Sequence, residues 1–177
     1  MLRRTILTLG LATFASAASG ATLSGPMQSY AWFPGRWACR TVTLGTGATG
    51  NAIPAKLWVV VDGTHDALKQ YFSMTTANGK RYRSDDVLTY DGKLKAFVRR
   101  TIDLNGSQTA LVAKAPYKPS MEYVGYIGLQ DGKIYRMKAT VAIDRAHTLM
   151  STATAFWHAD TKSWVVQTTG ACSKVAN

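Results

Sequence analysis

Polar and apolar residues alternate along most of the chain, and short turn-forming pairs separate the alternating segments. In 133–143, Tyr135, Met137 and Val141 share one face, while Arg136 and Lys138 lie on the other. Such alternation predicts a strand with one buried and one solvated face. Asn-Gly and Asp-Gly pairs favour tight hairpin turns because these residues tolerate positive φ. These pairs stand at 62–63, 78–79, 91–92, 105–106 and 131–132.

The segments predict about nine or ten strands joined as successive hairpins. Their ranges are 36–44, 53–62, 68–76, 81–90, 94–103, 108–114, 121–130, 133–143, 147–157 and 163–173. In the last of them we expect Trp164, Val166 and Cys172 to share a face. Closing such a sheet removes its unpaired edges, so we predict an all-β fold, a single antiparallel up-and-down barrel of about 8–10 strands. A two-sheet β-sandwich is the alternative, and residues 65–68 could form a short helical turn.

The N-terminus has the three parts of an export signal. Arg3 and Arg4 precede the apolar run 6–15, and small residues follow. This predicts a secretory signal peptide over 1–21, cleaved near 18–21, and a barrel domain over 22–177. The apolar run is too short to span a bilayer, so we expect no transmembrane segment. The protein is therefore predicted to be periplasmic or secreted.

Two cysteines, Cys39 and Cys172, lie near the two ends of the predicted barrel domain. An even number of cysteines in an exported chain predicts a disulfide. A disulfide between the first and last strands fits closure of the barrel, because those strands become neighbours. Two free thiols available to a metal or a redox partner are the alternative.

The first strand begins at the sequence WFPGRWACRT, from Trp32 to Thr41. Pro34 restricts φ, and Gly35 can adopt a backbone conformation that a side chain forbids. Trp37 then places a large apolar surface where the core begins. These features predict a structural corner at the start of the fold.

Gly35-Arg36-Trp37, just after Phe33, resembles the opening motif of the lipocalins and their relatives in the calycin group. The resemblance implies a lipocalin-like barrel whose base is closed by a short coil, with Trp37 packed beneath it. The last predicted strand carries no arginine to cover this tryptophan, and Lys174 is only a loose substitute. The haem-binding nitrobindins begin in the same way, but their Gly-rich continuation is absent here.

The positive net charge of the chain indicates a further class of partner. The chain has 21 Lys and Arg against 10 Asp and Glu, a net charge of +11. Arg3 and Arg4 account for two of these charges, so 22–177 carries +9. This balance favours polyanions or an anionic envelope component. We expect no nucleic-acid partner, because no basic helix or zinc-ligand spacing accompanies the charge.

The three histidines offer little chemistry by their spacing. His65, His147 and His158 fall at turns or strand ends, and no two have the spacing of a metal site. We therefore predict no metal site and no cofactor, with haem on a single histidine as the alternative.

Asp85 and Asp86 are adjacent in a predicted strand, so their side chains point to opposite faces. One of them can enter the barrel, where a salt bridge with Arg99 or Arg100 is favoured over a role as general base. No serine has the G-x-S-x-G context of a nucleophile. We therefore predict no catalytic residue.

Aromatic and methionine side chains on the strands are the candidates for a binding site. The predicted ligand-binding residues are Phe72, Met74, Tyr82, Tyr90, Phe97, Arg99, Tyr123, Met137 and Trp157. They predict binding of a small hydrophobic or amphipathic ligand in the lumen, with an arginine to pair with any acidic group of the ligand. The same residues could instead fill a solid core. The alternatives in function are a basic envelope protein that binds a polyanion or a protein through its surface, and a lipocalin-like isomerase or hydrolase.

Overall fold

Ten strands form in a computed structural model of the chain, which describes residues 22–44, 50–76 and 78–176. They are β1 (Gly35–Thr43), β2 (Ile53–Val61), β3 (Ala67–Thr75), β4 (Arg81–Asp91), β5 (Ala96–Asp103), β6 (Gln108–Lys114), β7 (Ser120–Gly128), β8 (Ile134–Ile143), β9 (Leu149–His158) and β10 (Ser163–Lys174). Every predicted strand is present and begins and ends within two residues of its predicted bounds. The predicted signal peptide, 1–21, lies outside the described residues.

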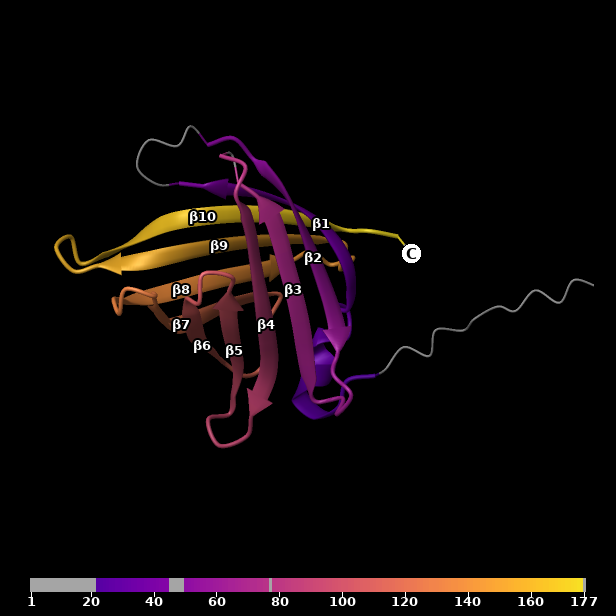
Figure 1. Ribbon diagram of the computed structural model, residues 1–177. Coiled ribbons are helices and arrows are strands. Elements are labelled where there is room, and N and C mark those ends of the chain that lie inside the picture. Colours follow the sequence, from indigo (N-terminus) through magenta and orange to yellow (C-terminus); the bar gives the residue numbers. More distant parts are fainter. Residues whose placement is uncertain (1–21, 45–49, 77, 177) are drawn as a thin grey trace, which may run out of the picture.

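The strands close into a single antiparallel barrel, as Figure 1 shows. Each strand pairs with its neighbours in sequence, and β1 pairs with β10 to complete the circle. Cys39 and Cys172 are direct partners in this last pairing and form a disulfide with an S–S distance of 2.04 Å. The barrel and the disulfide are thus confirmed, and the sandwich and free-thiol alternatives are not what the chain forms.

One prediction about the faces of the last strand is wrong. The register between β9 and β10 shifts between Val166 and Thr168. A bulge of this kind adds one residue to a strand and reverses the alternation beyond it. Cys172 lines the interior, whereas Trp164 and Val166 lie on the outer face. The three residues therefore do not share a face.

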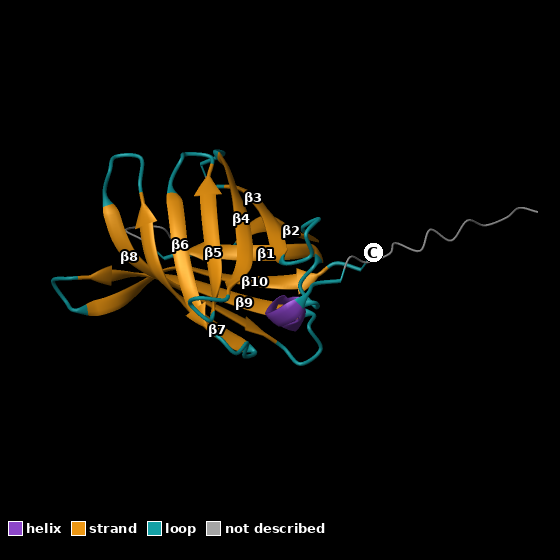
Figure 2. Cartoon of the chain, turned by 90° about the horizontal axis from the view of Figure 1, so that it is seen from below, coloured by secondary structure: helices purple, strands orange, loops and turns teal. Residues whose placement is uncertain are grey.

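A short 3₁₀-helix that the sequence pattern did not predict, η1 (Gly25–Tyr30), precedes β1. Pro26 lies in its first turn, where a backbone N–H would have no hydrogen-bond partner within the helix. Met27 and Tyr30 are buried beneath the strands. Figure 2 shows the helix at one end of the barrel, which it closes as a base. The segment 65–68 forms no helix, because β3 begins at Ala67.

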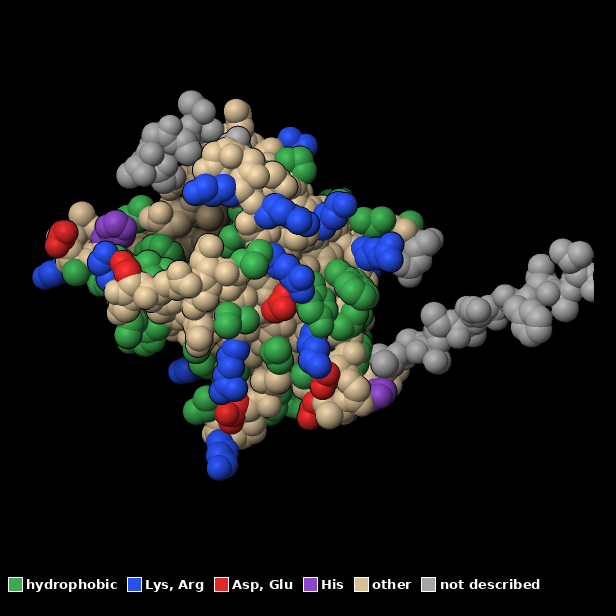
Figure 3. Space-filling view, in the orientation of Figure 1, with side chains coloured by type: hydrophobic (Ala, Val, Ile, Leu, Met, Phe, Trp, Pro, Cys, Tyr) green, Lys and Arg blue, Asp and Glu red, His purple; other side chains and the backbone are tan. Residues whose placement is uncertain are grey.

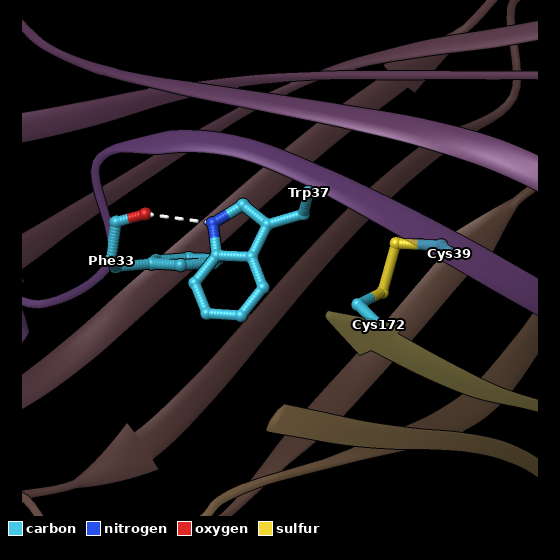
Figure 4. The surroundings of a disulfide bond; sticks show 4 residues. All are labelled: Phe33, Trp37, Cys39 and Cys172. Carbon is cyan, nitrogen blue, oxygen red and sulfur yellow. Dashed lines mark hydrogen bonds between the residues drawn. A yellow bond between two sulfur atoms is a disulfide. The ribbon is translucent and has the colours of Figure 1, made fainter. Parts of the chain in front are cut away.

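The predicted corner forms at this base. Gly35 has a φ of +128°, which side-chain-bearing residues rarely adopt. Trp37 is 1% exposed, and its indole Nε1 donates a hydrogen bond of 3.0 Å to the carbonyl of Phe33, as Figure 4 shows. Lys174 covers the indole from the last strand, with Nζ 5.4 Å from the ring centroid. Lys174, expected to be only a loose substitute for an arginine, therefore takes the position that covers Trp37.

Three of the five predicted turn pairs have a glycine with positive φ, at Gly79, Gly106 and Gly132. In the other two pairs the glycine is not at the left-handed position. There His65 (φ 63°) and Lys95 (φ 48°) adopt it. In these two turns the Asp-Gly pair begins the reversal, and a residue two or three positions later completes it.

Candidate functional site

The inward side chains leave a cavity of about 390 Å³ inside the barrel. Tyr30, Trp32 and Phe33 form its floor at the closed base. Six of the nine predicted ligand-binding residues line the cavity: Phe72, Met74, Tyr82, Arg99, Tyr123 and Met137. The volume falls in the range of about 300–1,000 Å³ that is typical of small-molecule sites. The barrel is therefore hollow in its upper part and packed at its base.

The other three predicted residues lie elsewhere. Tyr90 and Phe97 pack edge to face, with ring centroids 5.5 Å apart, and Phe97 is 1% exposed within the packed base. Trp157 pairs with Trp164, with centroids 5.5 Å apart, and the guanidinium of Arg136 lies 5.6 Å from its ring. None of the three lines the cavity, because β-strand alternation and the closed base direct them away from it.

A row of polar side chains crosses one wall of the cavity. Gln70, Asp86, Thr101 and Thr109 are successive cross-strand partners on β3, β4, β5 and β6. All four line the cavity. The Thr109 hydroxyl is buried and has no hydrogen-bond partner among the described residues. We call these four residues the polar row.

Asp86 of the polar row forms an ion pair with Arg99. Arg99 Nε lies 3.0 Å from Asp86 Oδ1, and the Thr101 hydroxyl donates to the same carboxylate oxygen. The side chain of Asp86 is 1% exposed and that of Arg99 is 26% exposed. This pair confirms the expectation that one of the two adjacent aspartates enters the barrel and meets an arginine.

The Arg99 guanidinium keeps its charge inside the wall. Burial by itself lowers the pKa of Arg99, but the neighbouring Asp86 carboxylate more than offsets this and raises the pKa. The guanidinium is therefore protonated. Its Nε donates to Asp86, and no other described protein atom accepts a hydrogen bond from its Nη groups. Arg99 lines the cavity, so these N–H groups are available to a molecule held there.

Two tyrosines join the floor to the wall. The hydroxyls of Tyr30, from η1, and Tyr123, from β7, lie 2.5 Å apart. Burial, first, and the neighbouring Tyr123, second, raise the pKa of Tyr30, and burial also raises the pKa of Tyr123. Both phenols are therefore neutral near pH 7. The floor also contains the indole Nε1 of Trp32, which is buried and has no partner among the described residues.

The three histidines do not line the cavity. His65 and His147 adopt positive φ in turns at the base, and His158 ends β9 at an exposed position. The imidazole of His147 stacks on Trp32 with centroids 5.5 Å apart. Within the described ranges, no group of three or more His, Cys, Asp or Glu residues is placed to hold a metal ion.

Several cavity residues were not predicted from the sequence. Gln70, Thr101 and Thr109 are short polar residues, and only their cross-strand alignment distinguishes them from other strand positions. A usable signal was the spacing of two from a predicted lining residue, as for Gln70 beside Phe72. The floor residues could not be found in this way, because they lie outside the strands.

The sequence matches no protein-family model and no curated protein. Among solved structures, the fold is similar to the crystal structure of Rv2717c from M. tuberculosis, with a TM-score of 0.68 and 14% sequence identity. That alignment covers 87% of this chain and 99% of the other. A de novo designed fluorescence-activating β-barrel aligns at 10% identity over 86% of this chain and all of its own, with a TM-score of 0.42.

At 14% identity, the similarity to Rv2717c shows a shared fold and no more. Across the described ranges, no helix is both long enough and apolar enough to cross a bilayer. The chain is thus a closed ten-stranded antiparallel β-barrel, joined end to end by a disulfide, with a cavity above a packed base.

Proposed function

We propose that the protein binds a small, mostly apolar molecule in the barrel cavity and holds the polar end of that molecule at the Asp86–Arg99 pair. The observation that carries the proposal is a cavity of about 390 Å³ with apolar side chains on most of its wall and the buried Asp86–Arg99 pair among its polar groups. Such a combination is the usual composition of a ligand site, in which a few polar groups set the orientation. The lipocalin-like start at Gly35-Arg36-Trp37 supports the same function.

The ion pair narrows the chemistry of the ligand. Asp86 already neutralises Arg99, so a ligand carboxylate would bring an uncompensated negative charge beside a buried aspartate. A neutral acceptor, such as a carbonyl, ester or ether oxygen, can accept hydrogen bonds from the Nη groups of Arg99 without bringing a second negative charge. The unpartnered hydroxyl of Thr109 offers a further contact. The favoured ligand is therefore a neutral amphipathic molecule.

The test is a titration of the protein with Nile red, a neutral apolar dye with a carbonyl oxygen. Binding is measured as the change in the fluorescence of the dye. Ile127 lines the cavity, whereas its neighbour Tyr126 is 59% exposed on the outer face. Ile127→Trp places an indole in the cavity and should abolish dye binding. Tyr126→Trp adds an indole outside and should leave it unchanged. Equal binding by both variants would show that the dye sits elsewhere and would contradict the proposal.

Charge preference is tested with an anionic dye of similar size, anilinonaphthalene sulfonate. The proposal expects weaker binding of this dye than of Nile red, because its sulfonate meets Asp86. Native mass spectrometry of the protein purified from its own cells shows whether a small neutral molecule is retained. Tighter binding of the anionic dye would contradict the assignment of a neutral ligand.

A further inference from the structure

The outer face of β1–β5 carries a cationic surface with exposed apolar side chains between the charges. We call this surface the basic face. Its cations are Arg36, Arg40, Lys56, Lys69, Arg81, Arg83 and Arg100. All seven are exposed, because strand alternation turns them away from the cavity. Figure 3 shows Lys and Arg side chains gathered over these strands, with hydrophobic side chains among them.

Most of this positive charge is not neutralised. Lys69 pairs with Asp62, and Arg83 pairs with Asp85. The other five cations have no carboxylate of the described residues within ion-pair distance. A surface with this excess attracts anionic partners and loses that attraction as salt screens it.

Trp58 lies within the basic face and is 52% exposed. It is the cross-strand partner of Arg36 on one side and of Tyr71 on the other, and its ring centroid is 5.7 Å from that of Tyr71. Lys56 is two residues away on the same face of β2. The indole therefore lies at a solvent-facing position beside two cations, Arg36 across the strands and Lys56 along β2.

Other apolar side chains continue this arrangement along the sheet. Val87 is 38% exposed and Ile102 is 50% exposed on β4 and β5. A soluble polysaccharide would need only the charges. A bilayer surface offers anionic headgroups to cations and an acyl boundary to a tryptophan and aliphatic side chains, and tryptophan is enriched at that boundary.

We propose that the basic face of β1–β5, with Trp58 within it, docks the barrel onto an anionic phospholipid membrane. The charges draw the sheet to the headgroups, and Trp58 enters the interface between them. The cavity lies on the opposite side of the barrel wall, so this docking does not depend on a ligand in the lumen.

The experiment is sedimentation of the purified disulfide-bonded protein with vesicles of phosphatidylglycerol and phosphatidylcholine, and with vesicles of phosphatidylcholine alone. We expect binding to the anionic vesicles at low salt and its loss at high salt. Arg36→Gln/Lys56→Gln should weaken binding by about 5-fold for each charge removed. Lys118→Gln/Arg145→Gln removes the same charge from turns at the base of the barrel and should bind as the unchanged protein does.

Trp58→Phe tests the interfacial contact. The unchanged protein should show a blue shift of tryptophan emission on anionic vesicles, and this shift should disappear in the variant. Ile127→Trp blocks the cavity and should bind vesicles normally, which separates docking from ligand binding. Equal loss in both charge variants, no blue shift from Trp58, or retention on an anionic polysaccharide without binding to anionic vesicles would each overturn the proposal.

Discussion

Lys174 lies directly opposite Trp37 in the pairing of β10 with β1, and its ammonium nitrogen is 5.4 Å from the centroid of the indole ring. The same ammonium donates a hydrogen bond to the carbonyl of Trp32. One side chain of the last strand thereby contacts both the first strand and the segment that enters it. The first and last strands of the barrel are therefore joined by Lys174 as well as by the disulfide.

Removing the indole should be costly, because Trp37 is fully buried in the base. We expect Trp37→Ala to lower the free energy of unfolding by about 3–5 kcal/mol. Lys174→Met keeps the aliphatic stem and removes the charge, and we expect a loss of about 1 kcal/mol. Urea denaturation followed by circular dichroism measures both. Trp58→Ala, at a position 52% exposed, serves as the control and should change the stability little.

The disulfide should be a large part of the stability of the barrel. Cys39 and Cys172 are 133 residues apart in sequence, and a cross-link over a loop of that length corresponds to about 5 kcal/mol in the chain-entropy model. We therefore expect Cys39→Ser/Cys172→Ser to unfold at much lower urea concentration. Peptide mapping without reduction should recover the two cysteines in one linked pair. Two unlinked thiols in the folded protein would contradict the disulfide between β1 and β10.

The Asp86–Arg99 pair should behave as a buried pair. Arg99→Met leaves the Asp86 carboxyl without its cationic partner at a position 1% exposed, and we expect a loss of about 3 kcal/mol. Asp86→Leu/Arg99→Met removes both charges and should lose less than the single variant. Arg83→Met breaks the neighbouring pair with Asp85 on the outer face, where both side chains are about half exposed, and should cost below about 1 kcal/mol. Equal losses for Arg99→Met and Arg83→Met in urea denaturation would contradict the buried site.

The tyrosines of the barrel interior should make the protein unstable in alkali. Burial raises the pKa of Tyr30, Tyr82 and Tyr123 above the ordinary value of 10.0. The unfolded chain ionises these phenols near that value, while the folded chain keeps them protonated. Their contribution to stability is therefore complete below about pH 10 and is lost as the pH rises toward the folded pKa values.

The measurement is phenolate absorbance against pH, with and without denaturant. In mildly alkaline buffer the folded protein should show less phenolate than the unfolded chain, and the missing absorbance should appear together with unfolding. Tyr82→Phe should reduce the phenolate absorbance that appears together with unfolding. Identical titration curves for the folded and unfolded protein would mean that these phenols are open to water.

Sequence alone was enough to predict the strands and their closure. Alternation with a period of two is a local consequence of the pleated backbone, so each strand could be located from its own residues. The turn pairs and the even number of cysteines then limited how the strands connect. The inward position of one of the two adjacent aspartates also followed, because adjacent residues of a strand point to opposite faces.

Tertiary structure decided the rest. The bulge between Val166 and Thr168 reversed the faces of β10, and no local pattern marked it. The helix η1 closed the base and turned Phe97 into a packing residue, while Tyr30 became part of the cavity floor. The polar row exists only because four strands place single polar residues in register. Register and closure are properties of several strands together, so the sequence of one strand does not contain them.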